Sequence, residues 1–245
     1  MSYLLFFLLS TLLATLFSMG GAGAGVALIP LLHFFGIDFN LAKAVGLFTG
    51  FTTTFTSSVM NFKRGVLDVK TVLLLALTLF VCAPLGAQLS RYVDTLLVKG
   101  LFAIFLFFSA TMMLFFKKEP KWHITASWVM ALLGSVVGVL AGLLGVGGGN
   151  MLLPLLILLG FPPKKVAVAV SFVVPFSALS SFLSYASFVT IDWGLLGACA
   201  AGAIVGGTIG NWLMHFKLSQ TDVRRVIATI LYLLAIKMAL TLFSV

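Results

Sequence analysis

The sequence predicts an all-α integral membrane protein built from about eight hydrophobic segments in two sets of four. Three observations lead to this fold class: the apolar composition, the alternation of apolar runs with short basic connections, and an internal repeat. Hydrophobic residues make up 61% of the 245 positions and charged residues 9%, whereas soluble domains carry roughly 25% charge. The chain therefore fits a lipid environment better than a soluble core.

Most of the apolar segments have about the 20 residues that a membrane-spanning helix needs. The first set covers residues 3–35, 41–61, 69–90 and 95–116, and the second covers 124–159, 166–188, 193–215 and 223–243. The first segment of each set is longer and contains a glycine cluster, so we expect it to break there and to resume as a short helix, at 26–35 and 150–159. The N-terminal segment looks like a signal peptide but lacks the positively charged n-region, so we expect it to belong to the mature structure.

The two sets superimpose at one constant offset of 124 residues, without a gap over about ninety positions. Gly25 falls on Gly149, Pro30 on Pro154 and Asp68 on Asp192. Self-similarity of this kind indicates a two-fold assembly of one four-segment unit. We therefore expect two transmembrane halves, residues 1–123 with the linker and residues 124–245.

The distribution of Lys and Arg distinguishes two topologies, because cytoplasmic loops are enriched in both residues. If all eight segments cross, the basic residues of the connections divide eight against six. If each first segment enters the membrane and returns, they divide eleven against three, and the three are Lys43, Arg91 and Lys99. The second topology makes the halves inverted repeats, with both termini outside. Residues 124–144 are long enough to cross alone, which keeps the first topology open.

Composition and spacing also argue against several function classes. The formal charge of +9 comes from short clusters between apolar runs, so we expect no nucleic-acid partner. Acidic residues fall at segment ends, which argues against a carboxylate relay and against an intramembrane protease. Cys82 and Cys199 lie in apolar segments without metal-type spacing. We expect neither an enzyme nor a bound metal or cofactor.

The two glycine clusters are the candidate substrate site. A helix that begins at a glycine break points its free N–H groups and positive dipole end into the membrane interior, where an anion can bind. Glycines also allow close helix packing, which is our interpretation of Gly202, Gly206 and Gly210. The candidate substrate-binding residues of the two clusters are Gly21, Gly23, Gly25, Gly145, Gly147, Gly148, Gly149 and Asn150.

Hydroxyl-rich stretches follow each cluster in the next segment. Thr53 and Ser57 in the first half and Ser177 and Ser181 in the second are further substrate-binding candidates, with interhelical hydrogen bonding as the alternative role. His33 is the imidazole expected at membrane depth. It is a candidate for proton coupling, with a structural histidine as the alternative.

Two halves that each open with G-x-G-x-G-x4-P resemble the sulfite exporter TauE/SafE family of membrane permeases. In the first copy Ala24 replaces a glycine, so we expect the second copy to be the stronger part of the site. The motif stands at Gly21, Gly23, Gly25 and Pro30, and again at Gly145, Gly147, Gly149 and Pro154.

The resemblance implies a multi-pass secondary transporter of the bacterial inner membrane. Its substrate would be a small anion, such as sulfite, another sulfur oxyanion or an organosulfonate, bound near the midplane between the two broken helices. A passive anion channel on the same architecture is the alternative. The expected partners are this anion and the lipid bilayer, and the sequence leaves open whether the chain forms a homo-oligomer.

Overall fold

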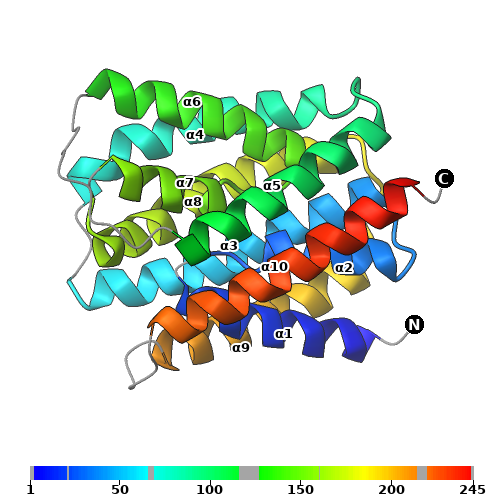
Figure 1. Cartoon of the computed structure of the whole chain (residues 1–245), viewed down its shortest axis with the longest axis horizontal. Coiled ribbons are helices and arrows are strands. Elements are labelled where there is room, and N and C mark those ends of the chain that lie inside the picture. Colours follow the sequence, from blue (N-terminus) through cyan, green and yellow to red (C-terminus); the bar gives the residue numbers. More distant parts are fainter. Residues whose placement is uncertain are drawn as a thin grey trace.

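The computed structural model describes residues 3–20, 22–65, 69–115, 127–159, 161–213 and 220–243. Every regular element in these ranges is an α-helix (Figure 1), as the composition predicts. The helices are α1 (Tyr3–Met19), α2 (Gly25–Phe34), α3 (Phe39–Lys63), α4 (Val69–Leu89), α5 (Thr95–Phe115), α6 (Ser127–Leu144), α7 (Gly149–Leu158), α8 (Pro163–Ala186), α9 (Trp193–Leu213) and α10 (Gln220–Phe243).

Six of these helices are long and apolar enough to cross a membrane, which makes the chain a multi-pass membrane protein. The candidate spans lie in α4, α5, α6, α8, α9 and α10. Many of their large hydrophobic side chains point outward, including Ile104 at 68% and Leu240 at 63% exposure. Such an apolar outer surface suits acyl chains and not water.

Each long first segment is broken where the glycines predict. α1 ends at Met19 and α2 begins at Gly25, while α6 ends at Leu144 and α7 begins at Gly149. The short helices start one residue earlier than expected. α2 and α7 have 10 residues each and therefore extend about 15 Å, half of a hydrocarbon core of about 30 Å.

Helix α3 begins two residues before the predicted segment because an aspartate caps it. Asp38 Oδ1 accepts hydrogen bonds from the backbone amides of Asn40 at 2.9 Å and Leu41 at 3.1 Å. These amides have no intrahelical acceptor, and a capping carboxylate also favours the positive end of the helix dipole. The first turn of α3 therefore starts at Phe39.

Glycine stripes hold two helix pairs in close contact. A Cβ at Gly202, Gly206 or Gly210 of α9 would overlap backbone oxygens of α1, which confirms the packing interpretation of that motif. α4 and α6 approach in the same way, because a Cβ at Gly86 or at Gly142 would overlap a backbone oxygen of the facing helix.

The centre of the bundle is the antiparallel pair α3 and α8. The rings of Phe48 and Phe182 lie 4.9 Å apart, and Asn61 Nδ2 donates to Ser171 Oγ at 3.1 Å. Residue numbers thus rise along α3 as they fall along α8. α2 packs against α3 and α7 against α8, so both short helices lie beside this central pair.

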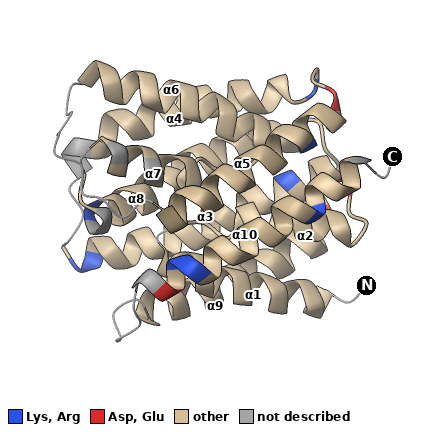
Figure 2. Ribbon diagram, in the orientation of Figure 1, with Lys and Arg blue, Asp and Glu red and all other residues tan. Residues whose placement is uncertain are grey.

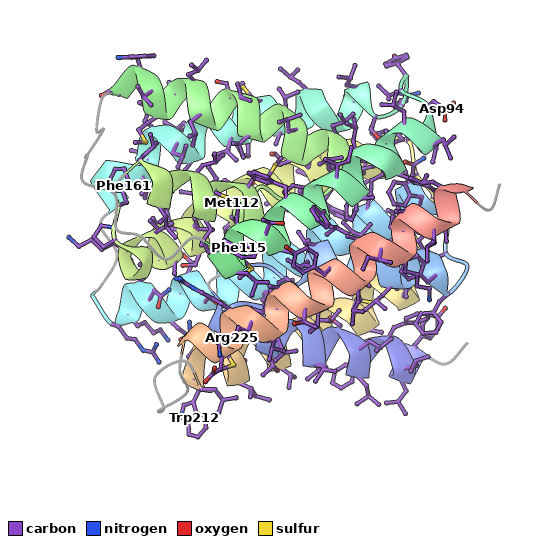
Figure 3. All side chains as sticks on the ribbon, viewed as in Figure 1. Asp94, Met112, Phe115, Phe161, Trp212 and Arg225 are labelled. Atoms are coloured by element: carbon purple, nitrogen blue, oxygen red, sulfur yellow. The ribbon has the colours of Figure 1, made fainter. Side chains whose placement is uncertain are left out.

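The bundle has two distinct ends. Figure 3 shows Asp94 at one end and Phe161, Trp212 and Arg225 at the other, and Figure 1 shows both termini at the end that carries Asp94. We call these the Asp94 end and the Phe161 end. Figure 2 shows the coloured charged segments mainly toward the two ends, with long tan stretches between them.

The chain leaves and returns to the Asp94 end through α1 and α2. The rings of Phe6, early in α1, and Phe35, directly after α2, lie 6.0 Å apart. α6 instead runs parallel to α4, since Gly134 faces Leu75 and Gly142 faces Ala83. α3 finishes at the Phe161 end of the bundle, and α4 starts there. α6, which is parallel to α4, therefore also runs away from the Phe161 end. α7 leads to Phe161 and so returns to that end.

Candidate functional site

Both short helices begin inside the protein without a cap. The N-cap residues are Ala24 for α2 and Gly148 for α7, and neither provides a side-chain hydrogen bond. Among the described residues, the amides of Gly149 and Asn150 find no hydrogen-bond acceptor. Residues 145–150 are all buried. A buried helix start normally has partners for its free amides, so this one is suited to an anionic ligand.

The backbone of the second break requires glycine. Gly145, Gly147 and Gly148 have φ angles of +77°, +69° and +76°, a left-handed conformation that glycine adopts without steric cost. At the first break Ala24 is right-handed, with φ −66°. The loss of one glycine in the first copy therefore corresponds to a different local backbone.

The described glycines of the first break are used in close packing. A Cβ at Gly25 would overlap the carbonyl oxygen of Gly46 in α3, and one at Gly23 would lie 3.2 Å from the Cα of Gly50. At the second break a Cβ would meet side chains instead, at Gly147 that of Ala178 at 3.2 Å. Gly21 lies outside the described residues.

Ser177 is the predicted hydroxyl that reaches a glycine break. Its Oγ donates to the carbonyl of Gly147 at 2.8 Å and to that of Val174 at 3.0 Å. Thr53 is fully buried and donates to the carbonyl of Thr49, within its own helix, at 2.8 Å. The structure thus joins Ser177 to the second break, while Thr53 is satisfied inside α3.

Ser57 and Ser181 occupy equivalent positions 124 residues apart but have different surroundings. Ser57 Oγ lies 3.0 Å from Ser18 Oγ and donates to the carbonyl of Thr53 at 3.1 Å. Ser181 Oγ is buried and has no hydrogen-bond partner among the described residues. The residue 124 positions after Ser18 is Gly142, which has no hydroxyl to offer. Ser181 therefore keeps a free donor inside the protein.

Asn150 and His33 differ in their relation to the site. Asn150 is the second residue of α7 and is 6% exposed, and its side chain makes no hydrogen bond to the described residues. His33 lies in the last turn of α2, where its Nδ1 is 3.1 Å from the carbonyl oxygen of Ile37 and its ring meets Phe39 edge-on at 5.3 Å. These contacts favour the structural alternative for His33.

The count of basic residues in the sequence treated Lys43 as part of a connection, but the structure places it inside the bundle. It is the fifth residue of α3, is 1% exposed, and donates from Nζ to Ser90 Oγ at 2.6 Å. Its alkyl chain packs on Gly145, where a Cβ would lie 2.7 Å from Lys43 Cγ. The signal for this position was available, since Lys43 is a lone charge inside the apolar segment 41–61 and its repeat counterpart is Ala167.

Comparison with known proteins agrees with this architecture. The family model described as "Sulfite exporter TauE/SafE" matches residues 6–238. The chain is 27% identical to the "Probable membrane transporter protein YunE" of Bacillus subtilis over 86% of its own length and 88% of that protein. It is 47% identical to "Sulfite exporter TauE/SafE family protein 1" of Arabidopsis thaliana over 23% of its length and 12% of that protein. No solved structure matches the chain.

Proposed function

The chain belongs to the sulfite exporter TauE/SafE family, and from this premise we propose that it is a secondary transporter that moves a small anion across the bacterial inner membrane. The observation that carries the proposal is the buried, uncapped start of α7 with its left-handed glycines. Free amides and a positive helix end attract an anion without a buried basic residue in direct contact.

Neutral hydroxyl and amide donors complete the proposed site at the second break. Ser177 already contacts Gly147, Ser181 has an unused hydroxyl, and Asn150 begins the short helix. Three or four such donors fit the oxygens of an oxyanion or a sulfonate group. The names of the relatives favour sulfite within this class.

Alternating access about the two halves, residues 1–123 and 124–245, is the proposed transport mechanism. α1 and α2 start and finish at the Asp94 end, and α6 and α7 at the Phe161 end, which supports two inverted repeats with re-entrant first segments. In transporters built this way, the substrate binds where broken helices meet, and one half moves against the other. The excess of basic residues in the connections at the Phe161 end then supports a cytoplasmic location for that end.

Transport and binding assays test the proposal together. Purified protein is screened by thermal shift with sulfite, thiosulfate, sulfate, isethionate and acetate, and the best binder is followed in proteoliposomes. Gly149→Val is expected to abolish flux, because its Cβ would lie 2.9 Å from a Val174 methyl group and the added methyl groups would cover the free amides. Gly197→Val is the control, since nothing lies within 4 Å of a Cβ there.

Two results would contradict the proposal. One is wild-type flux in a well-folded Gly149→Val protein. The other is fast, purely downhill conductance that no ion gradient can drive uphill, which would favour the anion channel instead. Uphill flux driven by a proton or sodium gradient supports the secondary transporter.

A further inference from the structure

A buried lysine that forms no ion pair with the described residues lies beside the second break. Lys43 is 1% exposed, and the ion pair found in the described part of the chain joins Arg225 and Asp222 instead. Its ammonium has three donors, of which Ser90 Oγ takes one at 2.6 Å. An isolated buried charge is costly unless it is compensated, so Lys43 calls for an explanation.

Two aromatic rings and the end of a helix stabilise the buried ammonium when no ligand is bound. Nζ lies 5.1 Å from the ring centroid of Phe39 and 4.9 Å from that of Tyr185, and both faces attract a cation. Tyr185 in turn donates to the carbonyl oxygens of Gly142 and Leu143 at 3.1 Å. These carbonyls form the negative end of α6, which also favours a nearby positive charge.

The fold itself does not require this lysine. At the equivalent position of the other half stands Ala167, and the counterpart of Tyr185 is Asn61. Asn61 donates to Ser171, without a buried cation. The charge is therefore found at one of the two breaks: Lys43 comes from the first half and lies beside the left-handed glycines of the second half.

Two further cations connect Lys43 to the surface of the Asp94 end. Lys99, which is half-buried, lies with its Nζ 5.6 Å from the same Phe39 ring. Arg91, which is exposed, stacks its Cζ 5.1 Å from the ring of Phe188. That ring lies 5.2 Å from the ring of Tyr185. The three cations thus form a cation–aromatic row (Arg91, Lys99 and Lys43), graded from exposed to buried.

The acidic residues at this end hold helix starts, and Asp38 attracts the Lys43 ammonium without forming an ion pair with it in the described part of the chain. Asp38 caps α3 through the amides of Asn40 and Leu41, and Asp94 accepts from the amide of Leu96 at 2.7 Å. Both carboxylates are thus bound to helix starts. A row of cations beside low-dielectric walls concentrates anions, which raises the rate at which anions arrive.

We propose that Lys43, with Ser90 and Tyr185, forms a second anion subsite at the Asp94 end, and that the cation–aromatic row leads oxyanions and sulfonates between the outside and the second break. The inference rests on the proposed function for the identity of the ligand as an anion. It adds a buried basic side chain and a route that the glycine motif does not contain. The two unused donors of the ammonium are available to the anion.

A charge-selective labelling experiment tests the subsite without requiring the transported substrate. Ser90→Cys is introduced with Cys82 and Cys199 replaced by alanine, and the thiol is labelled with anionic 2-sulfonatoethyl methanethiosulfonate or cationic 2-(trimethylammonium)ethyl methanethiosulfonate. Ser187→Cys, exposed at the same end, provides the reference rates. Lys43 also favours the thiolate, but this effect accelerates both reagents and cancels in their ratio.

The anionic-to-cationic rate ratio of the Ser90→Cys protein, relative to that of the Ser187→Cys protein, is expected to be at least about tenfold, because the two reagents carry opposite charges. Adding Lys43→Gln should reduce this ratio to about one, and adding Lys43→Arg should retain it. Excess isethionate should slow labelling at position 90 and leave position 187 unchanged. Size-exclusion profiles identify any variant that does not fold.

Equal ratios with and without Lys43→Gln would overturn the subsite, as would failure of both reagents to reach position 90 while they label position 187. Its failure is distinguishable from failure of the proposed function. If Gly149→Val stops transport but position 90 shows no charge preference, the proposed function stands without this subsite. If position 90 prefers the anionic reagent but no gradient drives uphill flux, the subsite stands and the secondary-transport proposal falls.

Discussion

Ser181→Ala removes a hydroxyl that is fully buried and has no hydrogen-bond partner in the described part of the chain. A buried polar group without a partner costs about 1–3 kcal/mol of stability, whereas an apolar group of the same shape is neutral or stabilising. We therefore expect the substitution to raise the free energy of unfolding by about 1 kcal/mol. For a chain of this size, that is a rise in Tm of about 2–4 °C.

The same substitution should weaken anion binding if Ser181 donates to the substrate. A hydrogen bond to a charged group contributes about 1.5–3 kcal/mol, which corresponds to a loss of about 10- to 150-fold in affinity. Stability and affinity are thus expected to change in opposite directions. A purely structural serine would not produce this pattern.

Ser57→Ala is the matched control, because Ser57 stands 124 residues earlier and its hydroxyl is satisfied. It loses the contact with Ser18 and the bond to the carbonyl of Thr53, so stability should fall by about 0.5–1.5 kcal/mol. Both variants are measured by thermal unfolding in detergent, with and without the anion identified in the screen. A lower Tm for Ser181→Ala with unchanged affinity would refute the assignment of Ser181 to the site.

Three more predictions concern helix packing and membrane topology. Gly206→Ala should lower the free energy of unfolding by about 1–3 kcal/mol, because the added Cβ overpacks against α1. At the open position of Gly197, alanine should raise the free energy of unfolding by up to about 1 kcal/mol through its higher helix propensity. Equal Tm values for the two variants would contradict the close approach of α1 and α9. Tyr92→Cys, at an 81% exposed residue, and Lys165→Cys should react with impermeant thiol reagents from opposite sides of the membrane, and labelling from one side would exclude the proposed topology. Tyr185→Phe should lower the free energy of unfolding by about 1 kcal/mol, because it removes the hydroxyl that donates to the carbonyls at the end of α6. An unchanged Tm would show that these hydrogen bonds do not contribute to stability.

The fold was predictable where one physical requirement dominates the sequence. Lipid exposure demands long apolar helices, and the glycine clusters mark where the first segment of each set breaks. The boundaries were less predictable, because local capping decides them. Asp38 extends α3 by two residues through its bonds to Asn40 and Leu41, an effect that hydropathy does not register.

The candidate site was predictable in kind and not in detail. Glycine spacing and the offset indicate a site at the helix breaks, but spacing does not reveal which glycines are in contact with a neighbouring backbone. Gly25 packs against Gly46, whereas Gly147 faces the side chain of Ala178. Lys43 was missed because a charge near the start of an apolar segment is expected to extend to the interface, and only the packing of α4, α6 and α8 around it shows that it does not.

The departures from the repeat show where the two halves differ in structure, and they are the positions that we propose to serve the substrate. A repeat retains what both halves need for packing, so positions that break it are free to serve the substrate. Gly142 instead of Ser18 leaves Ser181 without a partner among the described residues, and Gly148 instead of Ala24 turns the backbone left-handed. Lys43, opposite Gly145, has no charged counterpart. Gly142 and Gly148 belong to the second half, whereas Lys43 reaches the second break from the first half, so both halves contribute to the proposed anion contacts at this break.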